Sequence, residues 1–107
     1  MDGISPELSR ALARMFPPEA RWAYFQKRNG PMFVYNTERI HERYPTAAEG
    51  KFESAVFMPV GKGSRSGKAT RFEVLEASRS LHELRRDAKA RALRLYEEWE
   101  QTGKVVV

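Results

Sequence analysis

The segment GKGSRSGKAT, residues 61–70, comes closest of any stretch to a site that could hold a phosphate group. A phosphate-binding loop of nucleotide hydrolases has the form G-x-x-x-x-G-K-[ST]. Its backbone amides wrap the phosphates, its lysine reaches the terminal phosphates, and its hydroxyl group holds magnesium. Here Lys62 stands in place of the first glycine and Ala69 in place of the hydroxyl residue. A strand pattern follows, where the N-terminus of a helix would be needed to hold the phosphates. We therefore do not expect nucleotide hydrolysis.

The same segment concentrates positive charge, and no acidic residue occurs between Phe57 and Phe72. Its cations, with one at its base, are Lys62, Arg65, Lys68 and Arg71. Glycines leave the backbone free to adapt, so such an arm suits contacts with nucleic-acid phosphates that do not depend on base sequence. The alternative is a solvated hairpin tip that charge keeps soluble, because loop tips tolerate such composition. The sequence leaves both interpretations open.

A second group of residues interleaves aromatic and basic side chains. Its members are Trp22, Tyr24, Phe25, Phe33, Tyr35 and Phe57, with Arg21, Lys27 and Arg28 among them. Aromatic rings beside cations bind single-stranded nucleic acids by stacking under the bases. Most aromatic residues of a small domain lie in its core, so a core role is favoured for the group. Tyr24 and Tyr35 are the candidates for exposed rings, and the three cations would extend the phosphate contacts.

Residues arranged for catalysis or for metal binding are not found in the sequence. The chain has no cysteine, which excludes thiolate nucleophiles and thiolate metal sites. His41 and His82 lack the spacing of metal ligands, both from each other and from carboxylates. Ser64 and Ser66 lie in the glycine-rich segment, where no base could be held to activate them. We expect no enzymatic activity, no cofactor and no metal.

Composition sets the class of protein. A chain of 107 residues suffices for one domain with a modest core, and its 41% hydrophobic and 31% charged residues are typical of a folded protein. No apolar run is long enough to cross a bilayer, and the first residues lack a secretory pattern. We expect a soluble cytoplasmic protein with no membrane partner. Nineteen Lys and Arg against fourteen Asp and Glu give a net charge of +5, which favours polyanionic partners.

The first half of the chain predicts a short helix followed by an ambiguous stretch. Ser5-Pro6-Glu7 is typical of a helix start, and Pro17-Pro18 ends the helix. One face of it would carry Leu8, Leu12, Met15 and Phe16. Residues 18–28 fit either a strand leading into an Asn29-Gly30 hairpin or a second helix. Pro31 lacks the N–H that a two-residue hairpin needs after its turn, so the helix is slightly favoured.

The middle of the chain predicts an antiparallel sheet. Strands are expected at Met32 to Asn36, Phe52 to Val60 and Thr70 to Glu76, the last two joined as a hairpin. Apolar residues on both sides of Phe52 to Val60 indicate that both faces of this strand are covered. Pro59 lacks a ladder N–H, so the strand should lie at an edge or should end or bulge near this residue.

The last element predicted is a helix from about Leu81 to Gln101. Ser80 and Glu83 have the spacing of a capping box, and Gly103 is a plausible C-cap. One apolar stripe consists of Leu81, Leu84, Ala88, Ala92, Leu95 and Trp99. Oppositely charged residues four apart, Asp87 with Arg91 and Arg94 with Glu98, indicate a solvated face of mixed charge.

Together these patterns predict an α+β fold, with an antiparallel sheet, a short N-terminal helix and a long C-terminal helix on the sheet. Residues 1–107 would form a single domain with a flexible basic tip at about 61–70 and a short tail at 103–107. The function expected is binding of DNA or RNA through the basic hairpin, with little sequence preference.

The alternative function is a protein-interaction module or small regulatory subunit that docks on a larger protein or forms a homodimer. Leu93 and Tyr96 lie off the apolar stripe of the last helix, and the Val105-Val106-Val107 tail has nothing local to bury it. Unburied apolar residues of this kind mark interfaces, and two-fold homodimers are the commonest oligomers.

Overall fold

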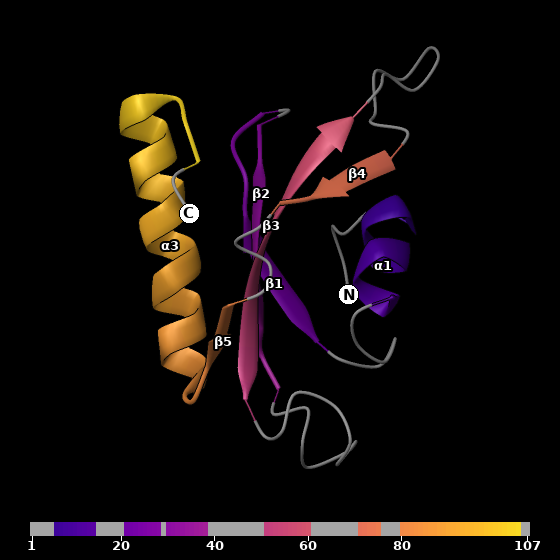
Figure 1. The fold of residues 1–107 in the computed structure, drawn as a ribbon, viewed down its shortest axis with the longest axis vertical. Helices are drawn as coiled ribbons and strands as arrows, with labels where there is room; N and C mark the ends of the chain where they lie inside the picture. The colour runs from indigo at the N-terminus through magenta and orange to yellow at the C-terminus, as the bar shows by residue number, and fades with distance from the viewer. Residues whose placement is uncertain are drawn as a thin grey trace.

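The computed structural model has three layers, with an antiparallel sheet between two helices (Figure 1). It describes residues 6–14, 21–28, 30–38, 51–60, 71–75 and 80–105. Helix α1, Pro6–Ala13, covers one face of the sheet, and helix α3, Arg85–Thr102, covers the other. The α+β fold with a helix at each end of the chain is therefore confirmed.

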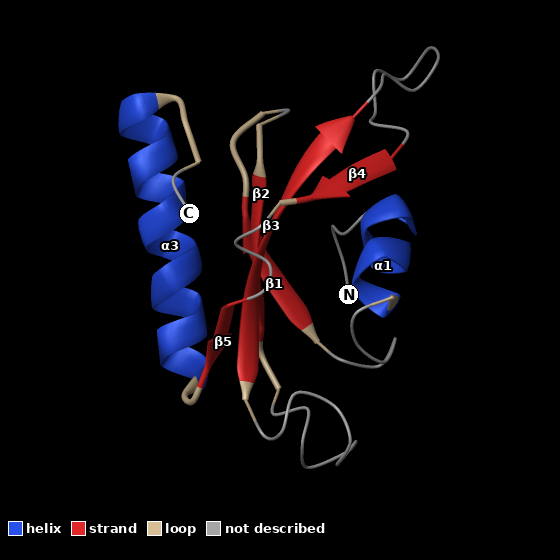
Figure 2. Ribbon diagram, viewed as in Figure 1, coloured by secondary structure: helices blue, strands red, loops and turns tan. Residues whose placement is uncertain are grey.

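All strand pairs in the sheet are antiparallel, and the central strand is β3 (Figure 2). The strands are β1 (Trp22–Phe25), β2 (Met32–Asn36), β3 (Phe52–Val60), β4 (Arg71–Val74) and β5 (Ser80–His82). Along the sheet the order is β1-β2-β3-β4, and β5 also pairs with β3. Strands β4 and β5 share one edge of β3, because β5 pairs with its first three residues and β4 with its last four. The predicted hairpin of β3 with β4 is confirmed.

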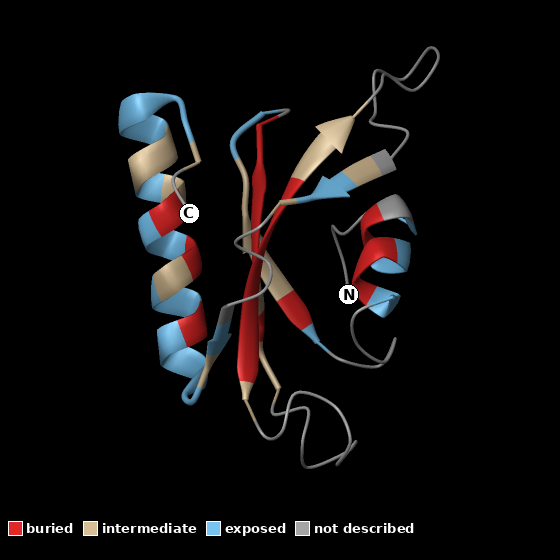
Figure 3. Cartoon of the chain, viewed as in Figure 1, coloured by how far each residue is buried: buried red, intermediate tan, exposed pale blue. Residues whose placement is uncertain are grey.

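Strand β3 is apolar on both sides because helices cover both of its faces. Ala55 and Phe57 belong to the cluster that packs against α1, where Leu8 and Leu12 are buried. Val56 belongs to the cluster on the other face, with buried residues of α3. Figure 3 shows the resulting buried band along the middle of the sheet. The prediction that both faces are covered is confirmed.

At Pro59, β3 does not have to donate a backbone hydrogen bond to β2. The Leu75 amide donates to the Val56 carbonyl at 2.9 Å, so Val56 turns its polar backbone groups toward β4. By the alternation of an antiparallel ladder, Phe57 and Pro59 turn theirs toward β2. The pairing with β2 ends at Phe57, opposite Met32, so the missing N–H of Pro59 interrupts no ladder bond.

The slight preference for a helix over residues 18–28 is wrong for residues 22–25, which form β1. The last pair of the β1–β2 ladder is Phe25 with Phe33, so the connection is longer than two residues. Pro31 therefore lies outside the ladder and need not donate a hydrogen bond. A strand also suits the side chains, because Trp22 packs on the α1 side and Phe25 on the α3 side.

The predicted start of the last helix is also wrong. Ser80–His82 is strand β5, and α3 begins at Arg85 after Leu84, whose side chain makes no cap hydrogen bond. The capping box is lost because Ser80 pairs with Ser54 of β3 instead. The C-cap is confirmed: Gly103 has φ of 74° and its amide donates to the Trp99 carbonyl at 2.7 Å.

The apolar stripe of α3 is confirmed for the residues inside the helix. Ala88, Ala92 and Leu95 are buried, and Trp99 packs against the same cluster. Leu81 and Leu84 precede the helix, and their exposed fractions are 50% and 42%. The helix is thus held to the sheet by its middle turns.

The turn between β1 and β2 is packed tightly against α3. A Cβ atom built on Gly30 would lie 2.5 Å from Cη2 of Trp99 and 2.8 Å from the Lys27 carbonyl oxygen. The Lys27 ammonium also lies 3.3 Å from the Glu100 carboxylate of α3. Only a residue without a side chain fits at position 30 while Trp99 keeps this place.

Replacing Gly30 by alanine should lower the free energy of unfolding by about 1–3 kcal/mol, because the added methyl group overlaps the Trp99 ring and a backbone carbonyl. Urea unfolding followed by circular dichroism measures the change. In a Trp99→Leu background the further loss on adding Gly30→Ala should be smaller.

The control is Gly103→Ala, because no atom lies within 4 Å of a Cβ at Gly103 but its φ is left-handed. This variant should lose about 1 kcal/mol through backbone strain alone, whatever residue stands at position 99. A Gly30→Ala protein with an unchanged urea midpoint would contradict the tight packing of the turn.

Candidate nucleic-acid interface

The two ends of β3 set the positions of the candidate functional residues. Strand β3 has nine residues, so its ends lie about 26 Å apart at 3.3 Å per residue. We call the end at Val60 the hairpin end, because β4 begins beside it with the pair Val60–Arg71. We call the end at Phe52 the β5 end, because β5 pairs there and α3 starts next to it.

The basic segment predicted to contact phosphates joins β3 and β4 at the hairpin end. Residues 61–70, with Lys62, Arg65 and Lys68, lie outside the described residues, as does the side chain of Arg71. Their predicted mobility and their role stay predictions. The described strands show only that both ends of the segment are held side by side at Val60 and Arg71.

Lys27 and Arg28 follow β1 and lie at the hairpin end as well. Strands β1 and β3 are both antiparallel to β2, so they run in the same direction and end on the same side. Lys27 pairs with Glu100 although 66% of its side chain is exposed, and Arg28 is exposed with φ of 23°. Two strand spacings, about 10 Å, separate β1 from β3 within the sheet.

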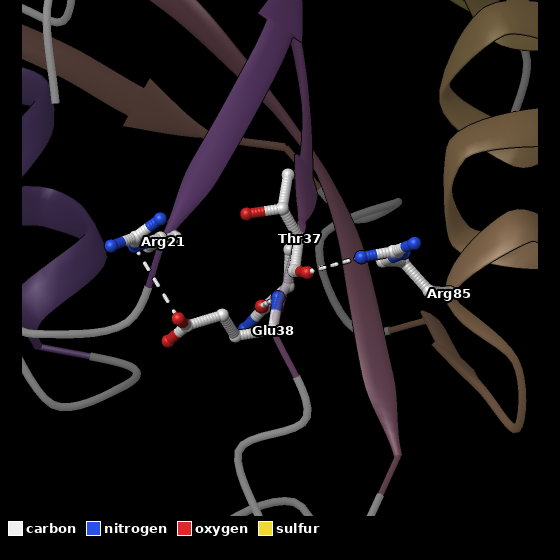
Figure 4. A network of polar contacts seen from close by, with 5 residues as sticks. Arg21, Thr37, Glu38 and Arg85 are labelled. Carbon is white, nitrogen blue, oxygen red and sulfur yellow. Dashed lines mark hydrogen bonds and ion pairs between the residues drawn. The ribbon is translucent and has the colours of Figure 1, made fainter.

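Arg21 lies at the β5 end, so the three cations predicted to form one track are divided between the two ends. Its guanidinium pairs with the Glu38 carboxylate at 3.3 Å, and its carbonyl accepts the Thr37 amide at 2.8 Å. The Thr37 carbonyl in turn accepts a hydrogen bond from Arg85 of α3 at 3.2 Å (Figure 4). The buried Asn36 fixes this turn through Oδ1, which accepts the Glu38 amide at 2.7 Å.

Tyr24 and Tyr35 are half-buried, each on a different face of the sheet. Tyr24 packs against the cluster under α1. Tyr35 packs against the cluster under α3, and its ring stacks on Phe25 with centroids 5.6 Å apart. Core packing accounts for much of both rings, and base stacking by their exposed parts stays a prediction.

Of the residues predicted to form a protein interface, some pack on the core and one is exposed. Tyr96 packs into the core, where its ring contacts Phe25, Phe33 and Trp99. Val105 packs on the same cluster, so this part of the tail is partly buried within the chain. Leu93 remains 37% exposed on the outer side of α3. Val106 and Val107 lie outside the described residues.

The feature that the sequence analysis missed is the separation of charge along α3. Its first ten residues, Arg85 to Arg94, hold five cations and one carboxylate, and its last eight hold three glutamates and no cation. The expected pairing of Asp87 with Arg91 and of Arg94 with Glu98 is wrong. In the part of the chain that the structure describes, neither arginine has a carboxylate within 4.0 Å. Counting charge by half-helix, instead of by pairs, would have revealed the separation.

A serine and a histidine meet next to this basic half of α3. Oγ of Ser54 lies 2.9 Å from Nε2 of His82, on neighbouring strands. The geometry resembles an activated nucleophile, but Ser54 is 1% exposed, so a substrate cannot reach its hydroxyl group. The contact therefore joins β5 to β3. Among the described residues, no group of three His, Cys, Asp or Glu residues could hold a metal ion.

The pKa of His82 is lowered below its ordinary value of 6.5, first because burial disfavours the charged ring. The positive charge of Arg91 lowers it further, Asp87 opposes this by raising it, and Arg94 adds a smaller lowering. The basic half of α3 thus creates a positive potential at His82, which lowers the pKa of its imidazole.

No protein-family model, curated protein or solved structure compared with the chain matches it. None of the described helices is both long and apolar enough to span a membrane.

The imidazole of His82 should titrate with a midpoint below pH 6.5 in the folded protein, which an NMR titration would measure. Because the unfolded chain binds this proton more readily, the stability contributed by neutral His82 should be complete above pH 6.5. It should be lost as the pH falls from 6.5 through the lowered pKa.

The control for this titration is His82→Gln, which should remove the His82 resonance and flatten stability against pH in that window. A midpoint of His82 at or above 6.5 would contradict the burial and the positive potential.

Proposed function

We propose that the protein binds nucleic acid through backbone phosphates, with the connection between β3 and β4 as a cationic arm. The observation that carries this proposal is the pairing of Val60 with Arg71. It fixes both ends of the segment that contains Lys62, Arg65 and Lys68 at one end of the sheet. Lys27 and Arg28 follow β1 at the same end.

Charge at the hairpin end supports phosphate as the ligand chemistry. The segment has no carboxylate, and the nearest one along the chain, Glu73, follows Arg71 by two residues. Each cation that meets a phosphate releases a condensed counterion, which favours binding. Contacts to phosphates carry no base information, so DNA or RNA would be bound with little sequence preference and without a cofactor. A cytoplasmic location belongs to this proposal.

The second candidate is a protein-interaction module, favoured by the exposure of Leu93 on the outer side of α3. Leu81 and Leu84 are also exposed near the start of that helix. A homodimer or a larger protein partner would bury these side chains. This candidate becomes the better one if the protein fails to bind nucleic acid.

Replacing Lys62, Arg65 and Lys68 together by alanine should weaken binding most at low salt. For a duplex, log affinity against log salt should lose about two to three units of slope, at about 0.9 per phosphate contact. Fluorescence anisotropy of a labelled duplex at several salt concentrations measures this slope, and a single strand gives about 0.7 per contact.

The matched control is Ser64→Ala with Ser66→Ala, which changes the same segment without removing charge and should leave the slope unchanged. A triple variant whose slope equals that of the wild type would overturn the arm. If the wild-type protein binds neither duplex nor single strand at low salt, sedimentation should be used to test for a homodimer instead.

A further inference from the structure

The charges of α3 are placed against the preference of the helix itself. A helix favours anions near its N-terminus and cations near its C-terminus, because its backbone dipoles align. Here Arg85 and Arg86 occupy the first turn beside one favourable anion, Asp87, whereas Glu100 lies in the last turn and no cation does. This arrangement weakens the helix. The stability of the helix therefore does not explain why these charges stand where they do. Violations of local rules occur where a surface has another role.

The positive half of α3 is poorly neutralised within the chain. Arg86 has Asp87 at the limit of an ion pair, 4.0 Å away. Arg85 donates to a backbone carbonyl, and in the described residues Lys89 and Arg94 have no carboxylate within 4.0 Å. Nε of Arg91 is buried without a hydrogen-bond partner. The charge of the exposed Lys89 and Arg94 is therefore available to an external anion.

These cations lie on the outer side of the helix. The inner side is defined by Ala88, Ala92 and Leu95, which are buried against the sheet. At about 100° per residue, Arg86, Lys89 and Leu93 fall within an arc of about 60° that points away from that stripe. Arg94 is exposed on one flank of the arc, and Arg85 is exposed on the other, nearer the buried stripe, where it donates to the Thr37 carbonyl. Figure 3 shows the exposed outer side of α3.

The basic half of α3 is separate from the hairpin end. It begins directly after β5, at the other end of β3, about 26 Å along the strand. Helix α3 also stands off one face of the sheet, away from the edge that carries β4 (Figure 1). The outer side of α3 and the strand ends at Val60 and Arg71 therefore lie apart.

We propose that Arg85, Arg86, Lys89 and Arg94 form a second phosphate-binding surface, so that one molecule binds two segments of nucleic acid and bridges them. The proposal rests on the proposed function, because it assigns the same ligand chemistry to both surfaces. Nucleic acid fits this surface better than an acidic protein. Protein interfaces are depleted of charged residues at their core, whereas within α3 four exposed cations accompany one exposed leucine, Leu93.

A bridging assay tests the proposal with two short duplexes of unrelated sequence. One duplex is immobilised on beads and the other carries a fluorescent label. The wild-type protein should retain the labelled duplex on the beads at low salt. The variant Arg86→Gln, Lys89→Gln, Arg94→Gln should reduce retention to background while it still binds the immobilised duplex. Sedimentation of each protein alone controls for bridging by a dimer.

Salt titration separates the two surfaces. The α3 variant keeps the arm intact, and the hairpin variant Lys62→Ala, Arg65→Ala, Lys68→Ala keeps the α3 surface intact. Each should therefore still bind a labelled duplex at low salt, with a slope of about 0.9 per phosphate contact of the surface that remains. The six-fold variant should lose both binding events, because the surfaces act independently. Glu97→Gln lies on the same helix, is exposed, and should leave bridging unchanged, so it controls for substitution within α3.

The outcomes distinguish this proposal from the proposed function. Retained bridging by the α3 variant overturns the second surface and leaves the arm standing if the hairpin variant weakens binding. Binding that falls only in the α3 variant overturns the arm, and with it bridging between the two surfaces. A wild-type protein that binds no duplex at low salt overturns both.

Discussion

The double-sided burial of β3 is the constraint on which the rest of the structure depends. Val56 faces one helix, and Ala55 and Phe57 face the other, so the strand cannot leave the middle layer without exposing one cluster. Full burial of a large apolar side chain contributes about 1.5–3 kcal/mol, and several such side chains meet along this strand. Strands β2, β4 and β5 take their register from it. The positions of the β1–β2 turn, of the turn after β2 and of α3 follow from that register.

Covering both faces of the sheet leaves its ends and the outer sides of the helices for contact with other molecules. The aromatic residues that could have formed an open stacking surface are drawn into the two clusters, as the stacking of Phe25 between Tyr35 and Tyr96 illustrates. The cations instead lie at the margins, because a charged group keeps its hydration there. A molecule built this way would meet an extended polyanion by its ends and edges.

Helix α3 shows how tertiary packing overrides local signals. It has no side-chain cap at its first turn, and its charges oppose its dipole. Burial of Ala88, Ala92 and Leu95 and the Gly103 cap hold it in place. The Lys27–Glu100 pair adds little, since most of the Lys27 side chain is exposed. Because the core carries the stability, the outer charges of the helix are free to follow another requirement.

The sequence by itself determined the elements whose signals are local and strong. The bounds of β3, the C-cap at Gly103, the burial of Leu8 and Leu12 and the α+β class all follow from periodicity and from glycine and proline chemistry. Only the tertiary structure decided that Trp22–Phe25 is a strand, that Ser80 pairs with Ser54 instead of capping a helix, and that Arg21 and Lys27 lie at opposite ends of the sheet. These outcomes depend on partners eight or more residues away along the chain. A short segment satisfies helix and strand patterns equally well until the strand beside it offers hydrogen bonds and a buried face.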